Sequence, residues 1–402
     1  MDPVTHGIAG ALIGKAFFSK RNARISIFAA TLGAVFPDVD IFVDAASRDP
    51  LAIARYHRGF THSFIGLPIF AAALAWLTRA LVSWYAKRTH REIGCPSFSM
   101  LFLIYAVGIA SHIILDGFTS FGTRMLKPFS KDRVAWDWLF IIDFVFTALI
   151  LVPQLIAWVH QEPKNSRSRG ATMWGFLTIL GLGAWALARA ASFPFSLWIV
   201  AIASAIFAAL CFLPAFDGWG SRIGRAKWCR AGFWIAFAYI VACGFAHHAA
   251  MARVRAFAIG HHIDAEKLGA LPLPPSLFDW NGLVLTRNGV YESDFSLLRS
   301  TNPDFRFVPD SPPNEFIVHA AKLEPVRTYL WFARFPVVRY FAAGGENMVE
   351  YADPRFFEGP EHGPMAFTFG VIFDAQGKLL HYGWISARAT LSRSASTAGK
   401  TQ

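Results

Sequence analysis

Six long apolar runs constrain what this chain can fold into more than any other feature of its sequence. A helix of about 20 apolar residues has the length needed to cross the hydrocarbon core of a bilayer. The six runs cover residues 63–86, 98–116, 139–159, 171–191, 195–213 and 231–251. Two shorter stretches, 5–18 and 25–36, would reach only part of the way across at about 1.5 Å per residue. The pattern predicts a polytopic α-helical membrane protein in which the short helices enter one leaflet or pack between the spans.

Composition agrees with a membrane protein and argues against other classes. Of the 402 residues, 54% are hydrophobic and only 16% are charged, whereas soluble domains have about 25% charged residues. With so little polar surface, neither an ordinary soluble enzyme nor a disordered chain is expected. The formal net charge of +11 is the excess that positive cytoplasmic loops give a membrane protein, so it does not imply a nucleic-acid partner.

The composition changes after Met251, where apolar runs shorten and Pro and polar residues become more frequent. Alternating apolar and polar residues predict strands at 282–287, 315–319 and 367–374. Residues 374–378 have the composition of a hairpin turn, which would join strands at 369–373 and 379–385. The predicted organisation is a membrane domain at 1–160, further transmembrane helices at 161–252, a β-rich (α+β) domain at 253–386 and a disordered tail at 387–402.

Basic residues lie in alternate loops and predict the orientation. They follow the first, third and fifth spans, in the groups Lys87, Arg88 and Arg91, then Lys164, Arg167 and Arg169, then Arg222, Arg225, Lys227 and Arg230. Positively charged loops stay in the cytoplasm. We therefore expect a multi-pass protein of a bacterial inner membrane whose β-rich domain is extracytoplasmic.

One basic loop opposes this bias, because it falls on the expected outer side. It contains Arg124, Lys127, Lys131 and Arg133. We interpret these residues as a solvated loop that faces anionic head groups, with an anion clamp beside the functional site as the alternative.

Acidic residues and histidines gather on the outer side. Nine of the ten carboxylates in residues 1–143 fall at outer helix ends or in outer loops, and only Glu92 lies on the basic side. Carboxylates in or beside apolar segments are costly unless they are paired or bind a cation. A divalent metal ion would supply that counter-charge, so we predict a metal site at this face.

Two pairs of residues have spacings that suit metal ligation. His112 and Asp116 are four residues apart near the outer end of a helix, so their side chains project from one face. The alternative is a hydrogen bond that closes the helix end. Asp38 and Asp40 follow Pro37 where the chain leaves a helix, and two carboxylates two residues apart can reach the same point. The alternative is a helix stop with solvated carboxylates.

The loop before the first span adds two histidines. His57 and His62 can converge only through the turn between them, which Gly59 permits. The alternative is an incidental pairing of loop histidines. His6, at the start of the first short helix, is equally a further ligand or an interfacial histidine.

Asp137 and Asp143 bracket the start of the third span. Asp143 lies inside the apolar run, which favours a functional role. Asp137 is also explained as a negative charge at a helix N-terminus.

Four motifs together resemble the YdjM family of membrane-bound, metal-dependent hydrolases, and they occur in the family's order. They are Thr5-His6-Gly7, Gly33-Ala34-Val35-Phe36-Pro37-Asp38-Val39-Asp40, His57-Arg58-Gly59-Phe60-Thr61-His62-Ser63 and Ser111-His112-Ile113-Ile114-Leu115-Asp116. The resemblance covers residues 1–159, and Ala352-Asp353-Pro354-Arg355-Phe356 is similar to a stretch in the outer domain of some longer members. The family is distantly similar to zinc-dependent phospholipase C, although the second His-x-x-x-Glu pair of that enzyme is missing here.

The resemblance implies metal-assisted hydrolysis of an ester or phosphoester by residues 1–160. With the spacings above, it gives as metal ligands His6, Asp38, Asp40, His57, His62, His112 and Asp116. Mixed His and Asp ligands suit zinc, with manganese as the alternative, as one or two ions. One of Asp40, Asp137 and Asp143 would stay free of metal and act as general base.

The expected depth of the site bears on the substrate and on the rival functions. A site at the membrane surface favours a membrane lipid or a lipid-linked substrate. Two other classes stay open: a structural or sensory membrane protein whose metal ties helices together, and an ion- or proton-coupled transporter. The sequence does not indicate an oligomeric state.

Overall fold

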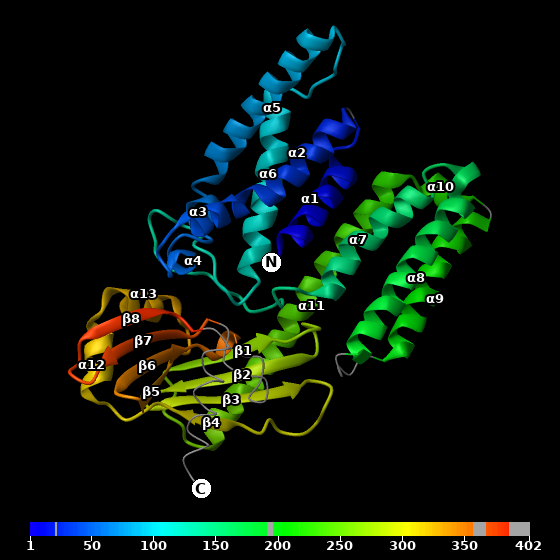
Figure 1. Cartoon of the computed structure of the whole chain (residues 1–402). Helices are drawn as coiled ribbons and strands as arrows, with labels where there is room; N and C mark the ends of the chain where they lie inside the picture. The colour runs from blue at the N-terminus through cyan, green and yellow to red at the C-terminus, as the bar shows by residue number, and fades with distance from the viewer. Residues whose placement is uncertain (21, 191–195, 217, 357–366, 386–402) are drawn as a thin grey trace. The chain divides into compact units, whose positions relative to one another are not determined.

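The computed structural model describes the chain except for residues 21, 191–195, 217, 357–366 and 386–402 (Figure 1). The expected tail at 387–402 therefore lies outside the described residues. The chain forms two compact units. Unit 1 consists of Met1–Pro37, Gly66–Ile114 and Phe144–Ile240, and unit 2 consists of Asp38–Ile65, Leu115–Asp143 and Val241–Gln402. The domain boundaries expected from the sequence stay predictions.

Unit 1 is helical. It contains α1 (Pro3–Phe17), α2 (Ala23–Val35), α5 (Leu67–Thr89), most of α6 (Phe98–Gly117), α7 (Phe144–Val159), η3 (Pro163–Asn165), α8 (Ser166–Ala190), α9 (Leu197–Phe216), α10 (Trp219–Ile223) and the first part of α11 (Arg225–Gly260). The start of α1 follows from its sequence. The Asp2 side chain accepts a hydrogen bond from the Thr5 backbone N–H at 2.9 Å, and Pro3 supplies a helical φ at the first position.

Small residues let the helices of unit 1 approach closely. A Cβ added at Gly10 would lie 2.6 Å from the Ala30 carbonyl oxygen, and one added at Gly108 would lie 2.7 Å from the same atom. Both α1 and α6 therefore contact the backbone of α2. Glycine and alanine at such contacts are typical of helices that pack within a membrane.

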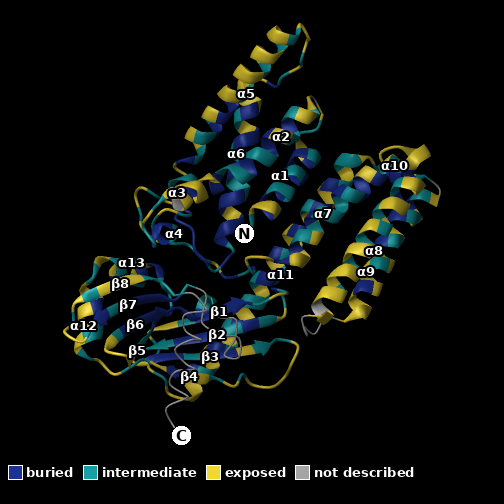
Figure 2. Cartoon of the chain, viewed as in Figure 1, coloured by how far each residue is buried: buried dark blue, intermediate teal, exposed yellow. Residues whose placement is uncertain are grey.

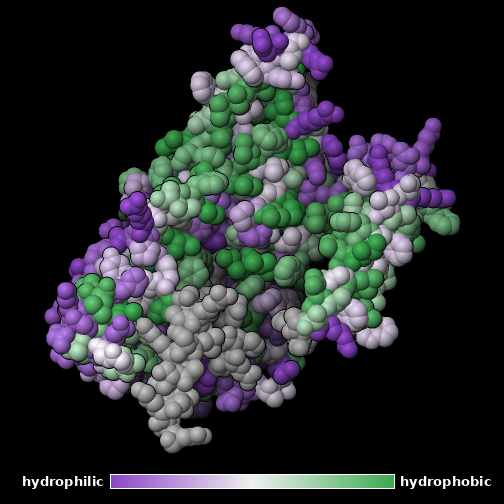
Figure 3. Space-filling view, viewed as in Figure 1, coloured by the Kyte–Doolittle hydropathy of each residue, from purple (hydrophilic) through white to green (hydrophobic). Residues whose placement is uncertain are grey.

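Among the described residues, six helices are long and apolar enough to cross a membrane. They are Ala23–Val43, Leu67–Thr89, Phe98–Gly117, Pro163–Leu187, Leu197–Phe216 and Arg225–Gly260. Their large apolar side chains are often exposed, as at Ile179 (71%) and Trp198 (77%) (Figure 2). Figure 3 shows hydrophobic side chains along the helices of unit 1. An apolar surface of this extent is expected where helices contact lipid.

Five of the six predicted spans correspond to these helices, and two other sequence predictions are wrong. The stretch at 25–36 does not end within a leaflet, because η1 (Phe36–Asp40) and α3 (Ile41–Ala46) continue α2 into a full span. The run at 139–159 forms a shorter helix that begins at Phe144. Residues 139–143 form a turn instead, in which the backbone N–H of Phe140 donates to Ser276 Oγ at 2.8 Å.

Unit 2 contains two four-stranded antiparallel sheets. The first consists of β1 (Lys267–Pro272), β2 (Asp279–Thr286), β3 (Gly289–Ser296) and β4 (Arg306–Pro309), and the second of β5 (Val337–Ala343), β6 (Glu346–Ala352), β7 (Phe369–Asp374) and β8 (Leu379–Trp384). The unit also contains helices α12 (Glu315–Lys322) and α13 (Glu324–Phe332), the short elements α4 (Ala52–Arg55), η2 (Phe60–His62) and η4 (Pro354–Phe356), α3, most of η1 and the end of α11. Leu51, from the segment before α5, is fully buried in one core with Tyr329 and Phe369. The loops at 38–65 and 115–143 therefore belong to the same compact unit as the sheets.

The strand predictions are confirmed with one exception. The strands at 282–287 and 367–374 correspond to β2 and β7, and β7 pairs with β8 in the predicted hairpin. The segment at 315–319 is helical instead. The Asn314 side chain accepts a hydrogen bond from the Ile317 backbone N–H at 2.9 Å, and this helix cap outweighs the apolar alternation.

Candidate metal centre

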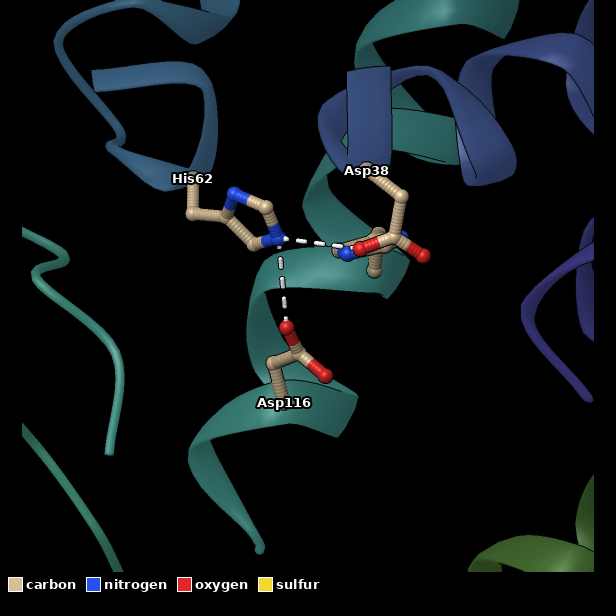
Figure 4. A group of neighbouring side chains, drawn as sticks. Asp38, His62 and Asp116 are labelled. Atoms are coloured by element: carbon tan, nitrogen blue, oxygen red, sulfur yellow. Dashed lines mark ion pairs between the residues drawn. The ribbon is translucent and has the colours of Figure 1, made fainter. Parts of the chain in front are cut away.

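Three side chains of unit 2 converge from separate elements (Figure 4). Asp38 lies in η1, His62 in η2 and Asp116 in the last turn of α6. His62 Nε2 is 3.4 Å from Asp38 Oδ1 and 3.3 Å from Asp116 Oδ2. The three side chains are buried, and one ligand atom from each lies within 4.8 Å of the others. We call these residues the metal cluster.

The spacing in the metal cluster fits a shared metal ion. Hydrogen bonds of the N–H···O type mostly measure about 2.7–3.2 Å, which is shorter than both distances from His62 Nε2. Ligand atoms bound tetrahedrally at about 2.0–2.1 Å from zinc lie about 3.3–3.4 Å from one another. The geometry therefore resembles the edges of a coordination tetrahedron.

The charges lead to the same conclusion. Asp38, Asp40 and Asp116 are buried carboxylates, and Arg58, whose Nε lies 2.9 Å from Asp116 Oδ2, brings one positive charge to them. Among the groups in direct contact, two negative charges are left over when the histidines are neutral; Arg124 and Arg133 act on Asp40 without contacting it. Buried charge of this kind requires a partner, and one divalent cation would balance it.

A second group shares Asp38 with the first. Ligand atoms of Asp38, Asp40 and His57 also lie within 4.8 Å of one another. A carboxylate common to two groups of ligands is the arrangement that a two-metal site requires, with ions about 3.5–4 Å apart. The chain therefore offers ligands for one or two ions, as the sequence predicted.

Asp40 holds both histidines of the loop. Its Oδ1 lies 2.9 Å from His57 Nδ1, and its Oδ2 lies 3.1 Å from His62 Nδ1. Thr61 Oγ1 donates to the same Oδ2 at 2.9 Å. A carboxylate on one ring nitrogen fixes a histidine so that the other nitrogen can bind a metal. This arrangement directs His62 Nε2 toward Asp38 and Asp116.

Arg58 turns the loop between the two histidines. Its φ of 54° lies in the left-handed region, its backbone N–H donates to Asp40 Oδ2 at 3.0 Å, and its Nη1 donates to Thr119 Oγ1 at 2.8 Å. Gly59 follows with φ −92° and ψ −127°, a combination outside the regions that other residues usually adopt, so glycine suits this turn. Glycine also gives the space that the loop needs, since a Cβ would lie 2.6 Å from the Tyr56 carbonyl oxygen.

Sequence reasoning missed Arg58 as a functional residue. It is 2% exposed and bonds to Asp40 and Asp116 at the same time. One signal in the sequence could have identified it. Arg58 is the basic residue between His57 and His62, in a motif that was itself predicted to lie beside several carboxylates. An unusual φ held by several contacts is also typical of functional sites.

The carboxylates around His62 control its protonation. Burial lowers the pKa of the imidazole, but the neighbouring carboxylates of Asp116, Asp38 and Asp40 outweigh it and raise the pKa to about 10. The cause is the excess negative charge described above. The cluster is thus an environment that strongly attracts positive charge.

His6 and His112 lie in unit 1. Their rings are stacked with centroids 3.6 Å apart, and both side chains are buried. His112 Nδ1 donates to the Ala34 carbonyl oxygen at 2.7 Å, which places the ring lone pair on Nε2. On α6, His112 precedes Asp116 by one turn, as expected, and the ligand roles of His6 and His112 stay predictions.

Asp137 and Asp143 contact the C-terminal part of unit 2. Asp137 accepts two hydrogen bonds from the Arg334 guanidinium, both at 2.7 Å. Asp143 accepts a hydrogen bond from Ser276 Oγ. Both carboxylates are buried, and their proposed catalytic roles stay predictions.

The segment Ala352-Asp353-Pro354-Arg355-Phe356 ties this part of unit 2 together. Arg355 Nε lies 2.8 Å from Asp353 Oδ2 in a pair that is almost fully buried. The same guanidinium donates to the carbonyl oxygens of Ser120 at 3.0 Å and Phe332 at 2.9 Å. The segment therefore links the loop after α6 to α13.

The basic loop is not the solvated loop that the sequence favoured. Arg124 is only 6% exposed. Its guanidinium carbon lies 5.6 Å from the ring centre of Trp331, and that of Arg133 lies 5.1 Å from the same ring. Lys127 is half-buried, and Lys131 is exposed. The burial favours the alternative interpretation, in which these residues act on an anion.

The fold and the site define a class: a helical membrane protein with a β domain and a buried Asp and His cluster suited to a divalent metal. Residues 1–191 match the family model described as YdjM inner membrane protein, the family expected from the motifs, and this match together with the six apolar helices supports a multi-pass inner-membrane protein. A Bacillus subtilis (strain 168) relative, the uncharacterized protein YfhP, is 28% identical over 157 residues. The match spans 36% of this chain and 43% of that relative's length. No solved structure is significantly similar to this chain.

Proposed function

We propose that this protein is a metal-dependent hydrolase of the inner membrane that cleaves an ester or phosphoester. One observation carries the proposal: the buried Asp38, His62 and Asp116 side chains converge at metal-ligand spacing with an excess of two negative charges. The YdjM motifs in residues 1–191 support it. The mixed oxygen and nitrogen ligands suit zinc, with manganese as the alternative.

Each residue of the site has a distinct task in this proposal. Asp38, His62 and Asp116 hold one ion, and Asp38 with His57 holds a second. A bound divalent cation supplies Lewis-acid activation of water and of the scissile bond. Asp40 orients the two loop histidines, and Arg58 holds Asp116 in place. His6 and His112 remain proposed ligands.

We assign the general base to Asp143 among the three carboxylates first considered. Asp40 is engaged by His57, His62 and Thr61, and Asp137 is neutralised by Arg334. Asp143 is buried and bonded to a neutral hydroxyl, that of Ser276. A general base contributes about 10²–10⁴-fold to such a reaction.

The positions of the basic loops support an extracytoplasmic location for the proposed site and the β-rich domain. Asp38 and Asp40 lie in the last part of the apolar segment Ala23–Val43, and Asp116 lies at the end of Phe98–Gly117, so we expect the site close to the membrane surface in this orientation. A membrane lipid or lipid-linked molecule is the substrate class that reaches such a site most directly.

The test compares Asp38→Asn with a matched control, Asp304→Asn, which changes an exposed carboxylate of the same unit. Each protein is purified in detergent and assayed for bound metal by mass spectrometry. Hydrolysis of bis(p-nitrophenyl) phosphate and p-nitrophenyl butyrate is measured on the same samples. We expect wild type and the control to bind metal and hydrolyse one substrate, and Asp38→Asn to lose both properties.

Asp143→Asn separates hydrolysis from metal binding. We expect it to retain metal and to lose hydrolysis by about 10²-fold or more. Equal loss of metal in Asp143→Asn and Asp38→Asn would make Asp143 a ligand. Wild-type protein that binds metal and hydrolyses neither substrate would support a structural or sensory role for the ion.

A further inference from the structure

The loop after α6 brings two arginines together. Thr123 and Val134 form an isolated antiparallel bridge, in which each backbone N–H donates to the other residue's carbonyl oxygen at 2.9 Å. Arg124 and Arg133 are the next residues on the two arms. Residues opposite one another on paired strands lie close enough to interact, and like charges in such positions repel.

These arginines lack the carboxylate partner that buried arginines usually have. In the part of the chain that the structure describes, no ion pair joins Arg124, Lys127 or Arg133 to a carboxylate, and the buried Nε atoms of both arginines have no hydrogen-bond partner. Arg133 Nη1 donates to the Gly122 carbonyl oxygen at 3.1 Å. Aromatic rings and backbone carbonyls hold the guanidinium groups, but they do not neutralise them.

The repulsion between the cations has a measurable consequence. Burial, followed by the neighbouring Arg124, Arg58 and Arg355, lowers the pKa of Arg133 well below its usual range, although the Asp40 carboxylate acts in the opposite direction. Burial, Arg124 and Arg133 also lower the pKa of Lys127. A bound anion would relieve this cost. We call Arg124, Lys127 and Arg133 the cationic cluster.

The cationic cluster borders the metal cluster through one turn of backbone. The Arg124 backbone N–H donates to the Arg58 carbonyl oxygen at 3.2 Å. The backbone N–H of Arg58 in turn donates to Asp40 Oδ2. A Cβ at Gly59 would lie 3.0 Å from Arg124 Nη2 and 3.6 Å from Lys127 Nζ. Arg124 and Lys127 therefore approach the backbone of Gly59 closely, in the same loop that carries His57 and His62.

We propose that Arg124, Arg133 and Lys127 bind the phosphate group of a phosphoester substrate beside the metal cluster. The inference rests on the proposed function and narrows its substrate class from esters in general to phosphoesters. Guanidinium groups bind phosphate through two parallel hydrogen bonds, and lysine adds a point charge. The cations hold the phosphate group, while the adjacent cluster of Asp38, His62 and Asp116 holds the metal.

The experiment measures binding of radiolabelled inorganic phosphate to the purified protein by equilibrium dialysis. Three variants are compared with wild type: Arg124→Gln, Lys127→Gln and the matched control Lys131→Gln, which changes an exposed lysine of the same loop. We expect Lys127→Gln to weaken phosphate binding about tenfold and Arg124→Gln by more than that, since bonds to a charged group are lost. Lys131→Gln should bind like wild type.

Lys127→Gln keeps the test decisive if Arg124→Gln fails to fold, because the Lys127 side chain makes no hydrogen bond within the described residues. Absence of phosphate binding by wild type, or equal affinity in wild type and Lys127→Gln, would overturn the proposal and leave the cations a purely structural role. Wild-type protein that binds phosphate and hydrolyses neither nitrophenyl substrate would contradict the proposed function instead.

Competition identifies the source of the phosphate. Dihexanoyl phosphatidate and glycerol 3-phosphate carry the same phosphomonoester, one on a lipid and one on a soluble molecule. Stronger displacement of the label by the phosphatidate supports the proposal with a lipid substrate, and equal displacement supports it with a soluble one. Displacement by neither compound would count against a phosphoester site.

Discussion

Unit 2 buries its carboxylates in two different ways. Asp137 and Asp353 are each matched by one arginine, with Arg334 bound through two bonds of 2.7 Å and Arg355 at 2.8 Å. The carboxylates of the metal cluster and Asp40 instead face two histidines and one arginine. In the first region each buried carboxylate charge is neutralised by one arginine, whereas in the second the carboxylates outnumber the arginines.

The difference separates residues that hold the fold from residues that can bind a ligand. Arginine is always charged and its donors are fixed in a plane, so its pair with a carboxylate is permanent. A neutral histidine contributes a lone pair and no charge. We therefore expect carboxylates grouped with histidines to be neutralised by a cation from outside the chain.

Breaking an arginine pair should produce the largest effect on stability. Arg355→Met leaves Asp353 buried and unpaired and removes the donors to Ser120 and Phe332, so we expect a loss of about 3–5 kcal/mol in the free energy of unfolding. Denaturation of the purified protein with and without a chelator measures it, and the loss should be the same in both conditions. Arg299→Met, which changes an exposed arginine, is the control. A loss that appears only with metal present would mean that this pair serves the metal site.

Removing metal should produce a smaller effect, confined to the histidine-containing cluster. At free metal of 100 times the dissociation constant, binding stabilises the folded state by about 2.7 kcal/mol, and chelation should remove that amount from wild type and from Arg355→Met alike. Asp38→Asn should show no response to the chelator. If the chelator does not change the free energy of unfolding of the wild-type protein, the metal assignment is refuted.

The same contrast explains which features the sequence predicted. The length of an apolar run is a local property, and it predicted most of the spans. The four-residue spacing of His112 and Asp116 is also local, and it predicted that they lie one turn apart on the same helix. Asp38, Asp40, His57 and His62 were grouped correctly because short motifs place them at helix ends and in one loop. Their contact with Asp116, which is distant in the sequence, was expected because the predicted topology puts all of them on the outer side.

Partners distant in sequence were not predictable from the same information. Arg334 is 197 residues from Asp137, and no periodicity links them. The start of α7 at Phe144 depends on Ser276, and the burial of Arg124 depends on Trp331. Each is decided by packing between segments of unit 2, so propensity and hydropathy alone gave a longer helix and a solvated loop.

The smallest predicted effect concerns Asp40, which shares features of both kinds of carboxylate: it contacts two histidines, and it also contacts Arg58. Its Oδ2 accepts bonds from Arg58, Thr61 and His62, and its Oδ1 meets His57. Asp40→Asn keeps one acceptor oxygen but loses the charge and the other acceptor, so the histidines are less firmly oriented. We expect metal affinity, measured by competition with a chelating dye, to fall about 10–100-fold, while unfolding in chelator stays as in wild type. Loss of all bound metal, as in Asp38→Asn, would make Asp40 a direct ligand, and unchanged affinity would remove it from the site.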